Sequence, residues 1–480
     1  MIENRAFYIN GSWMQPAAGK DFDVIDPSTE EPCAVISLGG QADTDAAVAA
    51  ARAAFETWAF ETDPQVRRAL VEKLYAIYER RSEEMARAMS LEMGAPIDYS
   101  REQQVPCFTW HAKNFLRAFE KFEFERPLGP HAPNDRILYE PIGVVAMITP
   151  WNWPINQVTL KVVPAMLTGC TMVLKPSEIA PLSSLLFAEM VDEAGFPAGV
   201  FNLVNGDGAG VGTQLSGHRD VDMVSFTGST RAGILISKNA ADTIKRVHLE
   251  LGGKGANMIF ADADEKAVTR GARHCFANSG QSCNAPTRML VERSVYDQAV
   301  EIAAKTAEAT KVGSAHEPGR HIGPVVSQAQ FDKIQGLIQK GIDEGARLVA
   351  GGPGRPEGFN RGYYVRPTVF ADVSNDMTIA REEIFGPVLS IIPFDSEDEA
   401  LKIANDTPYG LTSYVQSQDD ARRVRLARRL RSGMVEMNGK GRGAGSPFGG
   451  MKMSGNGREG SHWGLEDFCE VKAVSGWAAE

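Results

Sequence analysis

Apolar runs and helical stretches alternate between residues 143 and 250, and this alternation limits the possible folds more than any other feature of the chain. The run 143–149 is rich in β-branched residues and stops at Pro150, which is typical of a buried parallel strand. A helical stretch follows at 156–169, and a second strand at 171–174. Strand–helix repeats of this length predict an α/β fold with a right-handed, doubly wound parallel sheet.

The same alternation continues and then restarts after Lys254. The further expected elements are strands at 200–204, 223–226, 246–250, 257–260 and 288–291, and helices at 182–193, 230–241, 266–276 and 295–310. A chain of 480 residues exceeds the size at which a single core keeps growing. We therefore expect two α/β units in series that meet near 250–255.

Some segments lie outside this alternation. Helices are expected at 43–56, which is rich in alanine, and at 64–93, with one break near 80–83. The segment 122–139 mixes strand-like ends with proline and glycine, which indicates an antiparallel excursion from the first unit. Together with 470–474 it predicts a hairpin suited to contacts with other subunits.

Composition excludes several classes of protein. Apolar residues make up 43% and charged residues 23% of the chain, as in ordinary globular proteins. The net charge of −11 argues against a nucleic-acid partner, and the arginine-rich helix expected at 419–431 is typical of a solvated face. No signal peptide is visible and no apolar run approaches the ~18 residues of a membrane span, so we expect a cytoplasmic location without membrane contact.

The cysteines and histidines predict free thiols and no metal site. The six cysteines are scattered without a Cys-x-x-Cys pair, and the eight histidines form no ligand cluster. In a chain of this length such scattered cysteines favour free thiols in a reducing compartment over a disulfide framework. We expect neither a structural nor a catalytic metal.

A parallel sheet favours nucleotide binding where its strand order reverses, so the glycine-rich loops are informative. The loop 206–212 lacks the G-x-G-x-x-G spacing, and 439–444 has the spacing of a variant but no following helix. Two strand ends are better candidates. Lys175-Pro176-Ser177-Glu178 offers charged groups to ribose hydroxyls, and 226–230 starts a helix whose N–H groups favour phosphate. Taken alone, each segment is more often an ordinary loop cap.

A thiol and a carboxylate form the candidate catalytic pair. Cys283 follows Gly280-Gln281-Ser282, and its small neighbours leave room for a substrate carbon beside the sulfur. Glu250 opens the motif Glu-Leu-Gly-Gly-Lys upstream and can take a proton from the thiol or from a water. In isolation, a cysteine of this kind is more often a small buried hydrophobe.

Seven motifs in order show that the chain resembles the aldehyde dehydrogenase superfamily essentially from end to end. The motifs are Pro150-Trp151-Asn152-Trp153-Pro154, Lys175-Pro176-Ser177-Glu178, Phe226-Thr227-Gly228-Ser229-Thr230, Glu250-Leu251-Gly252-Gly253-Lys254, Gly280-Gln281-Ser282-Cys283, Glu383-Ile384-Phe385-Gly386-Pro387-Val388 and Pro447-Phe448-Gly449-Gly450. Seven motifs in one order are very specific. They favour a catalytic Cys283 over a structural one.

The resemblance implies that an aldehyde is oxidised on Cys283. Its sulfur would attack the carbonyl, and the amide of Asn152 with the backbone N–H of Cys283 would form an oxyanion hole, where such a donor is worth about 3–4 kcal/mol. After hydride transfer to nicotinamide, Glu250 would activate the water that hydrolyses the thioester. Lys161 and Glu459 occupy the family's proton-relay positions, although a plain buried ion pair is equally expected.

The resemblance also implies an NAD site. Glu383 would hold the nicotinamide ribose, and Phe385 would lie against the ring. Lys175 and Glu178 would bind the adenine ribose, and the carboxylate of Glu178 would repel a 2′-phosphate, so NAD should be preferred while NADP stays possible. The other implied cofactor contacts are Thr149, Trp151, Ser177, Gly208, Phe226 and Leu251, with Gly228 and Ser229 at the pyrophosphate.

The substrate side departs from many members of the family. The implied substrate residues are Trp153, Leu160, Ser282, Arg442 and Phe448. Trp153 replaces a phenylalanine of many relatives, and the loop 439–445 is basic and glycine-rich where many carry apolar anchors. Lys440 and Arg442 would either bind the acid group of a semialdehyde or ω-oxo acid, or point into solvent. Solvated side chains are the commoner arrangement and fit a plain aliphatic aldehyde.

The implied architecture has three parts. A variant Rossmann cofactor domain would comprise 1–121 and 142–249, and a catalytic α/β domain 250–453. A small bridging element, 122–141 and 454–480, would build a homodimer or homotetramer.

Three other functions remain open. A CoA-acylating semialdehyde dehydrogenase would release the thioester to CoA, but Glu250 argues against that class. A crystallin-like protein would have lost the nucleophile, and an esterase would work without NAD.

Overall fold

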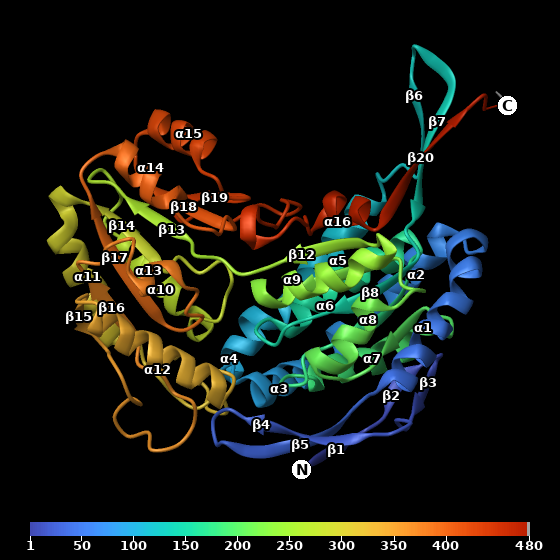
Figure 1. Ribbon diagram of the computed structural model, residues 1–480, viewed down its shortest axis with the longest axis horizontal. Coiled ribbons are helices and arrows are strands. Elements are labelled where there is room, and N and C mark those ends of the chain that lie inside the picture. Colours follow the sequence, from blue (N-terminus) through green and yellow to red (C-terminus); the bar gives the residue numbers. More distant parts are fainter. Residues whose placement is uncertain (478–480) are drawn as a thin grey trace.

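The computed structural model describes residues 1–477, and two seven-stranded sheets with flanking helices dominate it (Figure 1). Residues 478–480 of the expected bridging element lie outside the described part. The α/β class expected from the alternation is confirmed. The predicted elements between residues 143 and 310 are confirmed to within about two residues at their ends.

The first sheet consists of five parallel strands extended by an antiparallel pair. Its strands, in spatial order, are β12 (Arg246–Glu250), β11 (Met223–Thr227), β8 (Val144–Ile148), β9 (Thr171–Lys175), β10 (Phe201–Leu203), β2 (Phe7–Ile9) and β3 (Ser12–Met14). The chain adds β9 and β10 on one side of β8, and then β11 and β12 on the other. The order therefore reverses between β8 and β11, which places a crevice at the carboxyl ends of these two strands.

The second sheet repeats this plan with one antiparallel edge strand. Its strands, in spatial order, are β15 (Arg347–Ala350), β16 (Thr368–Ala371), β17 (Val388–Phe394), β14 (Arg288–Glu292), β13 (Ala256–Ile259), β18 (Thr412–Gln416) and β19 (Met434–Met437). The chain passes from β12 to β13 within the Glu-Leu-Gly-Gly-Lys motif, so the two α/β units meet where the sequence predicted. The limits of the three expected domains stay predictions.

Sixteen α-helices are described in residues 1–477. They are α1 (Gln41–Glu56), α2 (Pro64–Arg80), α3 (Ser82–Met93), α4 (Ile97–Tyr99), α5 (Pro106–Phe119), α6 (Pro154–Thr168), α7 (Leu182–Ala194), α8 (Thr213–Gly217), α9 (Thr230–Ala240), α10 (Ala267–Phe276), α11 (Tyr296–Ala309), α12 (Gln328–Asp343), α13 (Thr378–Arg381), α14 (Glu397–Asn405), α15 (Asp420–Arg429) and α16 (Ser461–Asp467). The break expected near 80–83 separates α2 from α3 at Arg81.

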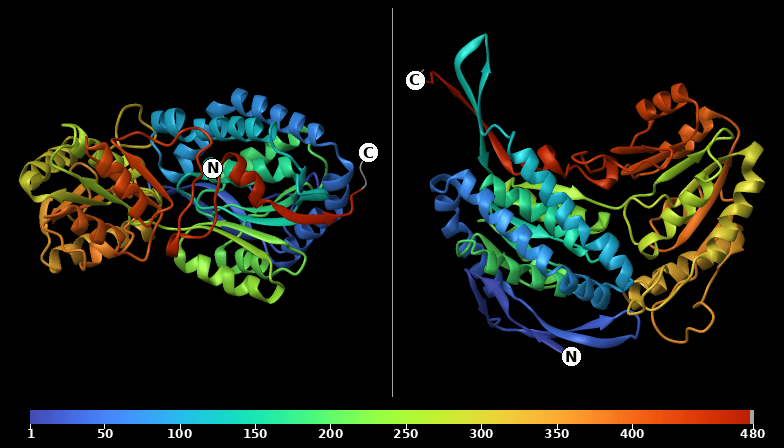
Figure 2. Two further views of the ribbon diagram at one scale, coloured as in Figure 1. Left: turned by 90° about the horizontal axis from the view of Figure 1, so that it is seen from above. Right: turned by 180° about the vertical axis from the view of Figure 1, so that it is seen from behind.

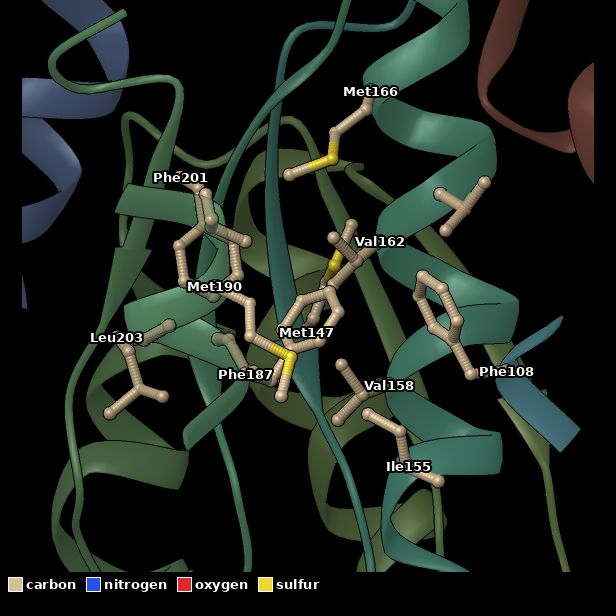
Figure 3. Close-up of a cluster of buried hydrophobic side chains, with 14 of the residues drawn as sticks. Phe108, Met147, Ile155, Val158, Val162, Met166, Phe187, Met190, Phe201 and Leu203 are labelled. Atoms are coloured by element: carbon tan, nitrogen blue, oxygen red, sulfur yellow. The ribbon is translucent and has the colours of Figure 1, made fainter. Parts of the chain in front are cut away.

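The core of the first unit lies between its sheet and the helices α5, α6 and α7. Every residue of α6 except Asn156 is buried, and Val158 and Val162 face Met147 of β8 (Figure 3). Phe187 of α7 closes the same cluster. Burying each such side chain stabilises the fold by ~1.5–3 kcal/mol. This packing fixes α6, whose N-terminus carries the motif that ends at Pro154.

An arm of three strands projects from the first unit (Figures 1 and 2). The strands β6 (Glu125–Gly129) and β7 (Ala132–Pro141) form a hairpin, and β20 (Cys469–Ser475) pairs antiparallel with β7. The antiparallel excursion predicted at 122–139, with 470–474 beside it, is thereby confirmed.

A further three-stranded sheet at the N-terminus was not predicted. It consists of β1 (Ile2–Asn4), β5 (Glu31–Leu38) and β4 (Lys20–Asp26).

Candidate active site

The crevice where the strand order of the first sheet reverses contains the residues singled out in the sequence. A cavity of about 230 Å³ lies there, against the second unit. Its lining residues are Pro150, Trp151, Asn152, Thr227, Gly228, Ser229, Glu250, Leu251, Gly252, Cys283, Gln330, Lys333, Glu383 and Phe385. The carboxyl ends of β8, β11 and β12 in the first unit therefore lie next to the loop of the second unit that contains Cys283.

An unusual backbone turn presents Cys283 to the cavity. Asn278, Ser279 and Gly280 have φ values of 52°, 56° and 74°, so three successive residues adopt the left-handed region. A non-glycine residue there costs of order 1–3 kcal/mol and persists only when its surroundings enforce it. At Gly280 a Cβ atom would lie 2.1 Å from the carbonyl carbon of Gly386, so only glycine fits.

Buried amide side chains that the sequence analysis missed hold this turn. The side chain of Gln281 accepts the backbone N–H of Val326 at 2.9 Å, and Asn278 donates to the carbonyl of Asn152 at 3.0 Å. Gln104 donates to the same carbonyl at 3.2 Å. Amide groups supply both donors and acceptors, so they can hold a turn that makes few ladder hydrogen bonds of its own. Gln281 belongs to the Gly-Gln-Ser-Cys motif, but no motif spacing marks Asn278 or Gln104.

The predicted oxyanion-hole residue lines the same cavity as Cys283. Asn152 is 4% exposed and lines the cavity with Cys283. Its amide nitrogen donates one hydrogen bond of 3.0 Å to the carbonyl of Gln281, which leaves its second N–H available. The indole nitrogen of the adjacent Trp153 donates to the hydroxyl of Ser282 at 2.9 Å. The Pro150–Pro154 motif therefore contacts the nucleophile loop at two points.

Glu250, the last residue of β12, has a buried carboxylate that is free to accept hydrogen bonds. It is 2% exposed, and among the described residues neither side-chain oxygen has a hydrogen-bond partner. Burial and the carboxylate of Glu459 raise the pKa of Glu250 well above its ordinary value, against the opposing charges of Lys161 and Arg458. A carboxylate whose pKa is raised in this way is suited to general-base work near neutral pH.

Lys161 and Glu459 form a buried pair behind this base. The ammonium nitrogen of Lys161 lies 2.6 Å from Oε1 of Glu459, and the two side chains are 0% and 3% exposed. The expected pair is therefore present, and its geometry agrees with a relay and with a plain ion pair alike.

The surroundings of Cys283 disfavour ionisation of its thiol. Burial raises the pKa of Cys283 above its ordinary value, and the carboxylates of Glu383, Glu250 and Glu459 raise it further. A thiolate is the nucleophile, so a base must remove the proton when the electrophile is present. Glu250 lines the same cavity and is a candidate for this base.

Glu383 and Phe385 close the side of the cavity that faces the second unit. Glu383 accepts the backbone N–H of Gly253 at 2.8 Å, and burial raises the pKa of this carboxylate. A Cβ atom on Gly252 would lie 2.4 Å from the Glu383 carboxylate, so glycine is required there. Phe385 has a φ of 59° and meets Trp151 edge-on, with ring centroids 5.4 Å apart.

Lys175 and Glu178 lie together at the carboxyl end of β9. The ammonium nitrogen of Lys175 is 3.5 Å from Oε2 of Glu178 and donates to the carbonyl of Gly206 at 2.5 Å. Burial lowers the pKa of Lys175, and the carboxylate of Glu178 opposes this effect. Ser177 is buried next to them, and Gly208 opens the helical turn Gly208–Gly212 that precedes α8.

The other predicted cofactor residues occupy neighbouring strand ends. Thr149 follows β8 and is buried, and Phe226 is a buried residue of β11. Ser229 is the N-cap of α9, where its hydroxyl accepts the N–H of Ala232 at 3.3 Å. Leu251 is buried directly after β12.

The structure brings some of the expected substrate residues into contact: Arg442 packs on Phe448, and Ser282 accepts a hydrogen bond from Trp153. The guanidinium of Arg442 lies 4.6 Å above the ring of Phe448 and 3.4 Å from Oε1 of Glu436, whereas Lys440 is exposed. Arg442 therefore contacts the protein, and both expected roles of this side chain stay predictions. Packing on an aromatic ring and pairing with a carboxylate hold it against the protein. Leu160 is buried in α6.

Two further findings concern the described residues only. Within residues 1–477, no helix combines the length and apolarity needed to cross a membrane. In the same part of the chain, no three His, Cys, Asp or Glu side chains gather in a way that could hold a metal ion.

The chain is similar over its whole length to proteins of one family. Residues 13–474 match the model of the aldehyde dehydrogenase family. The chain is 48% identical over 479 residues to 3-succinoylsemialdehyde-pyridine dehydrogenase of a Pseudomonas species, and the match covers 99% of each.

Solved structures give the same result. The structure of an aldehyde dehydrogenase from Bartonella henselae is 61% identical, with a TM-score of 0.99, and the match covers 99% of this chain and 100% of that one. A mutant of aldehyde dehydrogenase C from Pseudomonas syringae, complexed with NAD+ and octanal, is 48% identical with a TM-score of 0.97 over 99% and 97% of the chains. With its fold, its motifs and nearly its whole length in agreement, this chain belongs to the aldehyde dehydrogenase family.

Proposed function

We propose that this enzyme oxidises an aldehyde to the carboxylic acid with NAD, through intermediates bound to Cys283 that are hydrolysed by water activated by Glu250. One observation carries the proposal. Cys283, Asn152 and Glu250 line a single cavity together with Glu383 and Phe385, at the point where strand order reverses.

The residues around the cavity fit NAD. Gly228 and Ser229 line the cavity and precede α9, whose N-terminal N–H groups favour a phosphate. The buried hydroxyl of Thr227 lacks a partner among the described residues. Lys175 and Glu178 offer a donor and an acceptor to ribose hydroxyls. When bound, NAD supplies the acceptor for the hydride that leaves the aldehyde carbon.

The side chains then have distinct tasks. The thiolate of Cys283 adds to the aldehyde carbon, and the amide of Asn152 with the N–H of Cys283 stabilises the resulting oxyanion. Oxidation of this adduct leaves a thioester. Glu250 takes a proton from a water whose oxygen adds to the thioester carbon, and the carbon–sulfur bond breaks to return Cys283 as thiolate.

Product analysis tests this proposal. Aldehyde, NAD and enzyme should give reduced cofactor and carboxylic acid in equal amounts, and in H2¹⁸O the acid should contain one solvent oxygen. An acid without solvent oxygen, or turnover without NAD, would contradict it. A CoA-acylating enzyme would instead need CoA. Glu250 lines the cavity, and its side-chain oxygens have no hydrogen-bond partner among the described residues. They can therefore accept a proton from water, which supports hydrolysis over transfer to CoA.

We further propose a substrate class and an assembly. The related enzymes named above act on a semialdehyde or bind octanal, which supports an aliphatic aldehyde or semialdehyde here. The projecting arm, in which Val471 is 61% exposed, supports assembly into a homodimer or homotetramer. Light scattering after size exclusion should give a multiple of 52.1 kDa, and a monomer mass would contradict assembly.

A further inference from the structure

A histidine lies beside the proposed base and has no part in the mechanism above. His248 and Glu250 are two residues apart on β12, so their side chains leave the same face of the strand. The Nε2 atom of His248 lies 3.9 Å from Oε1 of Glu250 and 3.8 Å from Oε1 of Glu459. His248 is 4% exposed, and its Nε2 has no hydrogen-bond partner among the described residues.

Asp467 fixes the orientation of this ring. Its carboxylate accepts a hydrogen bond from Nδ1 of His248 at the end of α16. In a neutral ring Nδ1 therefore holds the proton, and the lone pair on Nε2 points toward the two glutamates. The guanidinium of Arg246 donates to the backbone carbonyls of Asp467 at 2.9 Å and Cys469 at 2.8 Å, which ties this segment to β12.

Glycines keep the space around the base and the ring free of other side chains. A Cβ atom on Gly457 would lie 2.2 Å from Nε2 of His248, and one on Gly449 would lie 2.5 Å from Oε1 of Glu250. Glycine at these two positions therefore leaves the imidazole and the carboxylate space to face each other, with Glu459 beside them.

Carboxylates and cations from several elements surround His248. The carboxylates are Glu250 on the same strand, Glu459 just before α16 and Asp467 on α16. The cations are Lys161 on α6, which pairs with Glu459, Arg246 on β12 and Arg458 next to Glu459. Burial would raise the pKa of Asp467, but His248, Arg246 and Lys161 together hold it below its ordinary value. A protonated imidazole at this position would compensate the charge of the proposed base.

We propose that His248, oriented by Asp467, is a positioning residue that receives the proton from Glu250 during thioester hydrolysis. The inference rests on the hydrolytic role proposed for Glu250. The oxygen of water adds to the thioester carbon, one water proton passes to Glu250, and the sulfur of Cys283 leaves as thiolate. The proton then moves from Glu250 to Nε2, which gives an imidazolium between Glu250, Glu459 and Asp467. Bulk water takes this proton when the acid product leaves.

The carboxylate of Glu250 is free to make this transfer. Neither of its oxygens is tied by a hydrogen bond among the described residues, so rotation of its side chain can close the 3.9 Å gap to Nε2.

Rapid mixing of His248→Asn and His248→Gln with aldehyde and NAD tests the proposal. The first turnover should give one reduced cofactor per site at a rate within about twofold of wild type, and the later steady state should be about tenfold slower. The acid limb of the steady-state pH profile should move up by about one unit, because without the Nε2 acceptor the proton on Glu250 must pass directly to water, which is easier at higher pH. Asp467→Asn should change the steady state in the same direction.

Controls separate this role from a structural one and from failure of the proposed function. His462→Gln, on the exposed face of α16, should leave both phases unchanged, and NAD binding should show that each variant is folded. An unshifted pH profile with a normal steady state in His248→Asn would overturn the proposal, as would an equal loss in both phases. If Glu250→Gln also hydrolysed the thioester normally, the proposed function itself would be wrong.

Discussion

The backbones of Gly280 and Gly386 approach so closely that a Cβ atom on Gly280 would lie 2.1 Å from the carbonyl carbon of Gly386. Gly280 belongs to the turn that presents Cys283, and Gly386 follows Phe385 in the second unit. The position of the nucleophile is therefore set by contact between two backbones, which no side-chain rearrangement can relieve.

Gly280→Ala should lower both stability and activity. The substitution combines a φ of 74° with a clash against backbone, so we expect a loss of about 1–3 kcal/mol in the free energy of unfolding. Displacement of Cys283 should reduce kcat more than the affinity for NAD. Denaturant unfolding and steady-state kinetics measure both effects. Gly336→Ala, in α12 with open space at its Cβ, is the matched control and should be neutral or slightly stabilising.

Cys283→Ala should abolish aldehyde oxidation while NAD binding persists. Without the sulfur no covalent adduct forms, so we expect a loss of about 10³-fold or more in kcat. Cofactor fluorescence titration checks the binding. Cys275→Ala and Cys107→Ala serve as controls, since neither thiol lines the cavity. A dead Cys275→Ala with normal stability would show that another thiol takes part.

Glu250→Gln should slow hydrolysis more than oxidation. Rapid mixing should give a burst of reduced cofactor near one per site, followed by a steady state slower by about 10²–10⁴-fold. A missing burst would mean that Glu250 is needed to activate Cys283.

Wild-type hydrolysis should become faster as pH rises. Glu250 acts as a base in its carboxylate form, and burial with Glu459 raises its pKa well above the ordinary value. The acid limb of the steady-state profile should therefore lie above the range of an exposed glutamate. A limb near pH 4 would contradict this prediction.

Glu178→Gln should narrow the preference for NAD over NADP by about tenfold, because the carboxylate that repels a 2′-phosphate is lost. The ratio of kcat/KM for the two cofactors is the measurement. Glu123→Gln, on the exposed surface, is the control. An unchanged ratio in Glu178→Gln would show that the adenosine end of the cofactor binds elsewhere.

Arg442→Ala should discriminate between the two substrate classes. If the guanidinium binds a remote carboxylate, kcat/KM should fall for a semialdehyde but not for the uncharged aldehyde of equal length, and the difference should shrink at high salt. Lys440→Ala, in the same loop but exposed, is the matched control. Equal losses for both substrates would show that Arg442 serves to hold Glu436 and Phe448 in place.

The alternation of strands and helices was sufficient to predict the α/β class and most elements from residue 143 to 310, because buried parallel strands have a distinctive composition. The sequence did not reveal the N-terminal sheet. Its strand β1 has three residues, and its pairing with β5 depends on residues far along the chain.

The candidate site was predictable to the extent that local motifs carry it. Cys283, Glu250 and Asn152 belong to recognisable segments, and the carboxyl ends of parallel strands bring two of them together. The contacts of Gln104 and His248 were not predictable. Each contact joins residues that are far apart in the sequence, and no motif marks either residue. The left-handed turn at Asn278 and Ser279 was missed since neither residue type requires it.

The long sequence separation between Cys283 and the residues that enclose the site also has a consequence for synthesis of the protein. Cys283 emerges from the ribosome long before Gly449, Glu459 and Asp467, whose segment folds back against β12. A nascent chain therefore exposes its nucleophile while the groups that enclose Glu250 have not yet been translated. An aldehyde that reaches this thiol before the site is assembled can form only a reversible thiohemiacetal, because oxidation and hydrolysis of the adduct need the complete site.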